Sequence, residues 1–125
     1  ALTTIDVSDA NFTGAVTAVP PRVVQLLLHR NAFSGPLPAM LPTSLQVLTA
    51  SNNRFAGTLP ASWGNLTSLA ALLVGGQSLD GTIPDSYRGM KALTTVSVAG
   101  CGLTGRVPAW MPAAWRNLQS LVLLG

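Results

Sequence analysis

Aliphatic residues recur along the chain in one short pattern, at the first, fourth and sixth positions of a segment. This alternation predicts a short β-strand whose apolar side chains face inward. Successive copies begin 21, 22, 24 and 24 residues apart. The five copies are Leu2-x-x-Ile5-x-Val7, Val23-x-x-Leu26-x-Leu28, Leu45-x-x-Leu48-x-Ala50, Leu69-x-x-Leu72-x-Val74 and Leu93-x-x-Val96-x-Val98.

Fixed positions after each segment predict a turn away from the strand. A glycine column favours a backbone site with positive φ, and a proline three residues later fixes φ and lacks an N–H donor. The glycines are Gly14, Gly35, Gly57, Gly81 and Gly105, and the prolines are Pro38, Pro60, Pro84 and Pro108. A period in the twenties with these features predicts a solenoid in which each repeat is one turn and the strands form a curved parallel sheet.

A second pattern places an aromatic residue three positions after a proline, at Trp63, Tyr87 and Trp115. This spacing predicts 3₁₀ or short helical turns on the convex side, with the aromatic side chain covering the core. Residues 108–111 interrupt the pattern as a four-residue insertion. We therefore expect the loop around Trp110 to bulge.

The ninth position of the repeat carries Asn31 and Asn53, whose amides can bond to the backbone of adjacent turns. Ala10, Gln77 and Cys101 replace this asparagine elsewhere, so we expect an interrupted amide ladder. Cys101 at this position is expected to be a small buried thiol rather than a reactive one.

Composition narrows the functional classes. A chain of 125 residues with 48% hydrophobic content can form one core, and its net charge of +3 comes from scattered cations without interleaved aromatics. We therefore expect no nucleic-acid partner. The longest apolar runs fall far below the roughly 20 residues of a membrane span. A single cysteine excludes an internal disulfide.

Catalytic chemistry has little material here, because the chain contains one His, four Asp, no Glu and one Cys. Ser8 and His29 occupy equivalent positions near Asp6 and Asp9, which sterically allows a Ser/His/Asp arrangement. Neither a nucleophile elbow nor an oxyanion motif accompanies it, and an open sheet does not exclude water. We expect no catalytic residue, metal or cofactor, with Asp9 paired to Arg30 and His29 on the surface.

The repeat resembles the plant-type class of leucine-rich repeats, L-x-x-L-x-L-x-x-N-x-L-x-G-x-I-P, over essentially the whole chain. The aromatic convex residues and the depleted asparagine column are similar to the surface-antigen branch of trypanosomatid protozoa, a combination that some algal repeat proteins share. The resemblance implies a right-handed α/β superhelix with a mostly irregular or 3₁₀ convex side. It also implies an extracellular or cell-surface recognition module, often glycosylated.

Two N-x-[ST] triplets are compatible with that location, at Asn11 and at Asn65. We expect Asn65 to be the better glycosylation site, because it lies on a convex turn.

The residues that flank the inward aliphatics should point to the concave face and bind the ligand. These candidates are Gln25, Leu27, His29, Arg30, Val47, Thr49, Ser51, Asn52, Leu73 and Ser97. An apolar ridge of Leu27, Val47 and Leu73 among hydroxyls favours a protein or peptide ligand, and a glycan is the next choice. The backbone at Gly75 and Gly76 should lie open to the partner. The alternative is a structural coat segment of a surface glycoprotein, without a ligand on these repeats.

The domain is expected to span residues 1–125, with about five repeats and the start of a sixth. Ile5 and Val7 at one end, and Leu121 and Leu124 at the other, should leave a hydrophobic cross-section. We therefore expect a longer repeat array or end-to-end association.

Overall fold

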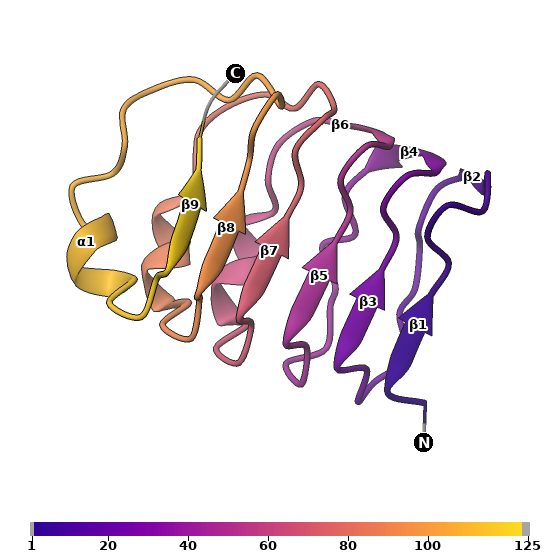
Figure 1. The fold of residues 1–125 in the computed structure, drawn as a ribbon, viewed down its shortest axis with the longest axis horizontal. Helices are drawn as coiled ribbons and strands as arrows, with labels where there is room; N and C mark the ends of the chain where they lie inside the picture. The colour runs from indigo at the N-terminus through magenta and orange to yellow at the C-terminus, as the bar shows by residue number, and fades with distance from the viewer. Residues whose placement is uncertain (1, 124–125) are drawn as a thin grey trace.

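Parallel strands, one from each turn, form the main sheet of the computed structural model, which describes residues 2–123 (Figure 1). Leu124 lies outside the described residues. The strand order is β1-β3-β5-β7-β8-β9, so each strand pairs with the strand of the next turn. The strands are β1 (Thr4–Asp6), β3 (Gln25–Leu27), β5 (Val47–Thr49), β7 (Ala71–Leu73), β8 (Thr95–Ser97) and β9 (Ser120–Val122).

The predicted register is confirmed. Leu26 pairs with Leu48, Leu48 with Leu72, and Leu72 with Val96 across the sheet. These four side chains are each at most 1% exposed. The aliphatic repeat therefore forms one continuous buried column, as expected when each turn buries its apolar edge against its neighbours.

A second, three-stranded sheet was not predicted. It contains β2 (Thr13–Gly14), β4 (Ala32–Pro36) and β6 (Arg54–Ala56), in that order, and runs along the upper side of the first three turns in Figure 1. The rings of Phe12, Phe33 and Phe55 stack beside it with neighbouring centroids 6.2 Å apart. Gly14 and Gly35 of the glycine column lie in β2 and β4, so segments that were expected only to turn away from the main sheet also pair with each other.

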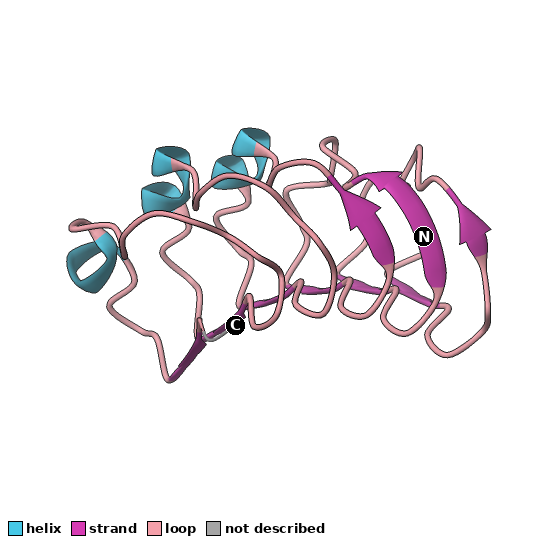
Figure 2. Cartoon of the chain, turned by 90° about the horizontal axis from the view of Figure 1, so that it is seen from above, coloured by secondary structure: helices cyan, strands magenta, loops and turns pink. Residues whose placement is uncertain are grey.

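Short helices form the convex side of the last turns, opposite the main sheet (Figure 2). They are η1 (Ala61–Asn65) and η2 (Asp85–Gly89), both 3₁₀, and α1 (Met111–Ala114). Trp63, Tyr87 and Trp115 point into the core, each at most 3% exposed. Burial raises the pKa of the Tyr87 hydroxyl.

Each of these three aromatic side chains donates a hydrogen bond to a backbone oxygen of the preceding turn. The Trp63 indole N–H donates to Pro38 O at 2.8 Å, and the Tyr87 hydroxyl donates to Pro60 O at 2.9 Å. The Trp115 indole N–H donates to Tyr87 O at 2.9 Å. The apolar body of each ring therefore fills the core while its polar group ties two turns together.

The amide ladder continues one turn further than the sequence suggested. Asn53 accepts from the Phe33 N–H at 3.1 Å, and Gln77 accepts from the Phe55 N–H at 3.2 Å. Gln77 also donates to Val74 O at 2.8 Å. The prediction that the ladder is interrupted at Gln77 is wrong, because the longer glutamine side chain reaches the same backbone groups.

Cys101 occupies the same ninth position of the repeat in the next turn, with a thiol in place of the amide. Its thiol is fully buried and donates to Val98 O at 2.7 Å. Burial raises the pKa of this thiol. The expected small buried thiol is confirmed.

Candidate functional site

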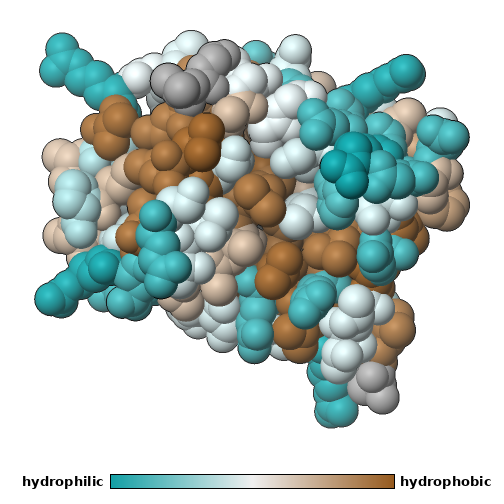
Figure 3. Space-filling model, in the orientation of Figure 1, coloured by the Kyte–Doolittle hydropathy of each residue, from teal (hydrophilic) through white to brown (hydrophobic). Residues whose placement is uncertain are grey.

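One row of side chains crosses the exposed face of the main sheet at the third position of each strand. Asp6, Leu27, Thr49, Leu73 and Ser97 pair in register from strand to strand. Figure 3 views this face and shows hydrophobic and hydrophilic areas side by side. The face therefore offers apolar contact and hydrogen bonding within one row.

A shallow hollow of about 220 Å³ lies where β3, β5 and β7 end. All the residues that line it belong to the predicted ligand-binding set: His29, Arg30, Thr49, Ser51, Asn52 and Leu73. The fold thus gathers side chains that are 44 positions apart in the sequence, from His29 to Leu73. The other candidates, Gln25, Leu27, Val47 and Ser97, lie outside this lining.

Thr49 and His29 are less free than the sequence suggested. Thr49 is only 9% exposed, and its Oγ1 lies 2.6 Å from Nδ1 of His29. His29 is itself half-buried. Thr49 is therefore more buried than its place on the concave face predicts, and it bonds to His29 across neighbouring strands.

Asp9 and Arg30 form the predicted ion pair at the edge of the hollow. Nη2 of Arg30 lies 2.8 Å from Oδ2 of Asp9, and Nε lies 2.5 Å from Oδ1. The hydrogen bond and charge of Arg30 lower the pKa of Asp9, and Asp9 raises the pKa of Arg30. This bidentate geometry fixes the guanidinium and matches its charge within the chain.

The Ser/His/Asp arrangement that the sequence allowed is not assembled. The Ser8 hydroxyl donates to Oδ1 of Asp6 at 2.6 Å, while His29 bonds to Thr49. The Ser8 side chain and its backbone N–H both lower the pKa of Asp6. Ser8 therefore bonds to the Asp6 carboxylate, and the histidine bonds to a different side chain.

Gly75 and Gly76 differ in what they expose. Gly75 is buried, and a Cβ placed on it would lie 2.3 Å from the carbonyl oxygen of Ala99. Gly76 is exposed, with a φ of 73°. The prediction that both backbones lie open is wrong for Gly75, because the neighbouring turn covers it.

The predicted apolar ridge is also interrupted. Leu27 and Leu73 lie in one row but are separated by Thr49. The three ridge residues, Leu27, Val47 and Leu73, are half-buried. Val47 belongs to the adjacent row, where it pairs with Gln25 and Ala71. The concave face thus presents separate apolar spots between polar groups.

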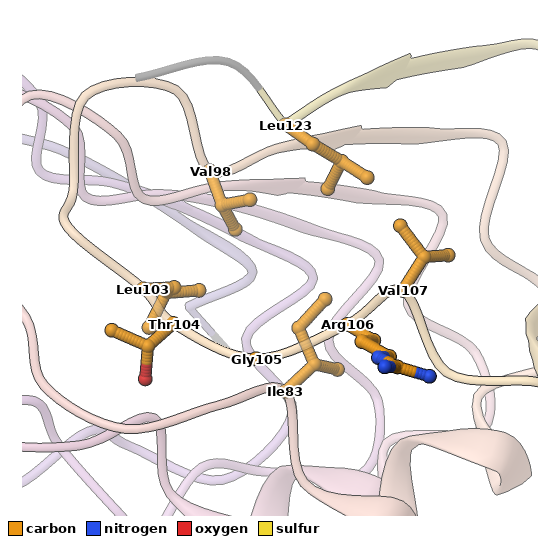
Figure 4. Close-up of a pocket in the computed structure, with 8 residues that line it drawn as sticks. All are labelled: Ile83, Val98, Leu103, Thr104, Gly105, Arg106, Val107 and Leu123. Atoms are coloured by element: carbon orange, nitrogen blue, oxygen red, sulfur yellow. The ribbon is translucent and has the colours of Figure 1, made fainter.

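Sequence reasoning missed a second hollow of about 180 Å³ near the last two strands (Figure 4). Its side chains are arranged around an apolar space: Ile83, Val98, Leu103, Thr104, Arg106, Val107 and Leu123, with Gly105. The relevant position in the repeat lies two residues after the glycine. Leu37 and Leu59 at this position are 3% exposed, whereas Val107, which lines the hollow, is 59% exposed.

Both triplet asparagines, Asn11 and Asn65, are exposed. Asn65 ends η1 on the convex side. Among residues 2–123, no three His, Cys, Asp or Glu side chains come together as a metal site. The helices in the same part of the chain are too short to cross a membrane.

Comparison with known proteins agrees with this architecture. Residues 44–66 match the Leucine Rich Repeat family model. The receptor-like protein EIX2 of Solanum lycopersicum is 34% identical over 68 residues, which is 52% of this chain and 7% of that protein. The chain therefore spans only a small part of this relative.

Solved plant receptors superpose on nearly the whole chain. The peptide hormone receptor RGFR1, in complex with RGF2, matches 95% of this chain and 20% of its own with a TM-score of 0.88 and 30% identity. The Arabidopsis receptor kinase HAESA, in complex with the peptide hormone IDA and the co-receptor SERK1, matches 98% of this chain and 22% of its own. Its TM-score is 0.90 and its sequence identity is 25%. The PEPR1–AtPEP1 structure matches 96% of this chain and 18% of its own, with a TM-score of 0.89 and 30% identity.

The chain is thus a leucine-rich repeat solenoid. Its particular likeness is to plant receptors and a plant receptor-like protein. These relatives give no support to the trypanosomatid surface-antigen branch.

Proposed function

We propose that this chain is a non-catalytic binding module of a secreted or cell-surface leucine-rich repeat receptor, which recognises a polypeptide on its concave sheet. The observation that carries the proposal is the hollow at the ends of β3, β5 and β7. The likeness to RGFR1, HAESA and PEPR1 supports it. RGFR1 is a peptide hormone receptor solved with RGF2, HAESA was solved with the peptide hormone IDA, and the third structure is PEPR1–AtPEP1.

The chemistry of the hollow suits an irregular peptide surface. Ser51 and Asn52 supply donors and acceptors, and Leu73 supplies an apolar contact. Leu27 adds a second apolar spot two strands away from Leu73. Interfaces of this mixed character gain their affinity from a few apolar anchors and their orientation from the polar groups.

Arg30 has a supporting role in this proposal. Because Asp9 already matches its charge, a ligand carboxylate would have to compete with an intramolecular pair. We therefore assign Asp9 and Arg30 to orienting the partner and to the association rate.

The absence of catalysis is part of the same proposal. Ser8 donates to Asp6 and His29 bonds to Thr49, so the serine and the histidine are not paired as a nucleophile and its base. We also propose an extracellular location with Asn65 as the preferred glycan acceptor, supported by its exposed convex position.

Peptide selection followed by mutation tests the proposal. Peptides would be selected from a random display library on the immobilised chain, and their dissociation constants measured for Leu73→Asp and Leu27→Asp variants. We expect each variant to weaken binding by about tenfold or more, because an anchor side chain is replaced by a charge.

The matched control is Met40→Asp, which introduces the same charge at a residue 83% exposed outside the hollow. It should leave binding unchanged, and circular dichroism should show that all three variants are folded. Selected peptides that bind all three variants equally would place the binding surface elsewhere and refute the proposal.

A further inference from the structure

The largest of the described hollows, about 440 Å³, lies on the convex side between η2 and α1. Figure 2 shows these two helices as neighbours at the C-terminal end of the convex side. Its lining is Arg88, Gly89, Lys91, Trp110, Ala113 and Ala114. The insertion at residues 108–111 supplies Trp110, so this hollow exists only where the repeat pattern is broken.

Trp110 is held in place from two sides. Its ring packs edge-to-face against Trp115, with centroids 5.5 Å apart at 78°. Its indole N–H donates to Oδ1 of Asp85 at 3.2 Å. The side chain remains half-buried rather than enclosed, so a fixed aromatic surface faces the hollow.

Two cations border this aromatic surface. The guanidinium carbon of Arg88 lies 5.9 Å from the Trp110 ring centroid, and Lys91 lines the same hollow. Among residues 2–123, the only ion pair within 4.0 Å is Asp9–Arg30, so neither cation has a carboxylate partner there. The hollow therefore favours an anionic occupant.

Gly89, Ala113 and Ala114 keep the floor of the hollow low, because none has a side chain larger than a methyl group. The C–H face of a pyranose ring can therefore approach the part of the indole that Arg88 does not cover. Asp85 lies next to the hollow, where its Oδ1 accepts from Trp110, and its exposed carboxylate has a second oxygen that can accept from a ligand hydroxyl.

We propose that this convex hollow binds an acidic sugar, with a uronic acid unit of an oligosaccharide as the occupant. Its carboxylate would pair with Arg88 and Lys91, the C–H face of its ring would lie on Trp110, and its hydroxyls would donate to Asp85. An acidic peptide satisfies the cations but brings carboxylates to Asp85 without hydroxyl donors. The sugar matches all three groups with one compact unit, and the site is independent of the concave surface.

Indole N–H signals in ¹H–¹⁵N NMR spectra test this proposal directly. The chain has three tryptophans, and Trp63 is buried away from the hollow, so its signal serves as an internal reference. The probes are a uronic acid trisaccharide, the matching neutral hexose trisaccharide, and a triglutamate peptide. We expect the Trp110 signal to shift with the uronate alone, with a dissociation constant of about 1 mM or lower.

Paired variants identify the groups responsible. Arg88→Gln with Lys91→Gln should weaken uronate binding by about tenfold, while Arg54→Gln with Arg106→Gln, which removes the same charge elsewhere, should not. Ala113→Gln should block the hollow, whereas Ala109→Gln, at an exposed position outside the lining, should not. Leu73→Asp should leave uronate binding unchanged even where it abolishes peptide binding.

Several results would overturn the proposal. Equal shifts with the neutral sugar would remove the role of the cations, and equal binding of triglutamate would make the occupant an acidic peptide. No shift of Trp110 at millimolar uronate, with the Trp63 signal showing a folded chain, would exclude the site. None of these outcomes bears on the concave surface.

Discussion

Asn53 and Gln77 donate to the same acceptor, the carbonyl oxygen of Ala50, at 3.2 and 2.8 Å. The two side chains belong to consecutive turns and both are buried. Ala50 directly follows β5, and its neighbours in the chain, Thr49 and Ser51, line the concave hollow. The buried amides thus fix the backbone directly beneath the proposed binding surface.

Gln77→Ala should lower the free energy of unfolding by about 1–3 kcal/mol, because the Phe55 N–H loses its acceptor in a buried site. Denaturant unfolding measures this loss. Gln46→Ala is the matched control, since Gln46 is exposed, and should change the value by less than about 0.5 kcal/mol. Equal effects at both positions would contradict the role assigned to Gln77.

Leu72→Ala should cost about 2–5 kcal/mol, because it opens a cavity in the central column of the sheet. The same unfolding experiment on Met40→Ala, at a residue 83% exposed, provides the reference. A cost below about 1 kcal/mol for Leu72→Ala would mean that the column is not the core of the solenoid.

Gly75→Ala should destabilise the chain by about 1–3 kcal/mol, since the new methyl group meets the Ala99 carbonyl oxygen and the turn must shift. Ser51 occupies the same position one turn earlier with a larger side chain, so Ser51→Ala should be nearly neutral. Thermal unfolding of both variants distinguishes a local close approach from a general intolerance of side chains at this position.

Titration of the carboxyl groups by ¹³C NMR should give Asp9 a pKa below its ordinary value of 3.8. Because the folded-state pKa is lowered, the pair contributes stability above the unfolded pKa and loses it as the pH falls through the folded pKa. Arg30→Gln should raise the pKa of Asp9 toward 3.8. Asp6 should remain low, since Ser8 is its main cause; a similar rise at both residues would contradict the assignment.

The sequence predicted what depends on repetition. Leu26, Leu48 and Leu72 recur at one template position, and burial of that position in the inner turns leaves a single register for the strands. Trp63 and Tyr87 were placed in the core for the same reason. A residue type that recurs at the same position of each turn predicts only the structural features that the turns have in common.

Features that depend on one side chain's reach or on one close contact were predicted less well. Gln77 reaches the ladder with one methylene more than asparagine has, and Thr49 is buried and bonded to His29. Gly75 is buried by the approach of a neighbouring backbone. Such details are set by distances between turns, which the repeat pattern does not encode.

The most direct test of the central claim is an NMR map of amide shifts on the chain with a peptide selected from the display library. Recognition on the concave sheet predicts the largest changes in residues 25–30, 47–52 and 71–76, where the hollow and its flanking strands lie. Residues 61–65 and 85–89 on the convex side should change little. Changes confined to those convex segments, with the concave strands unaffected, would contradict the account.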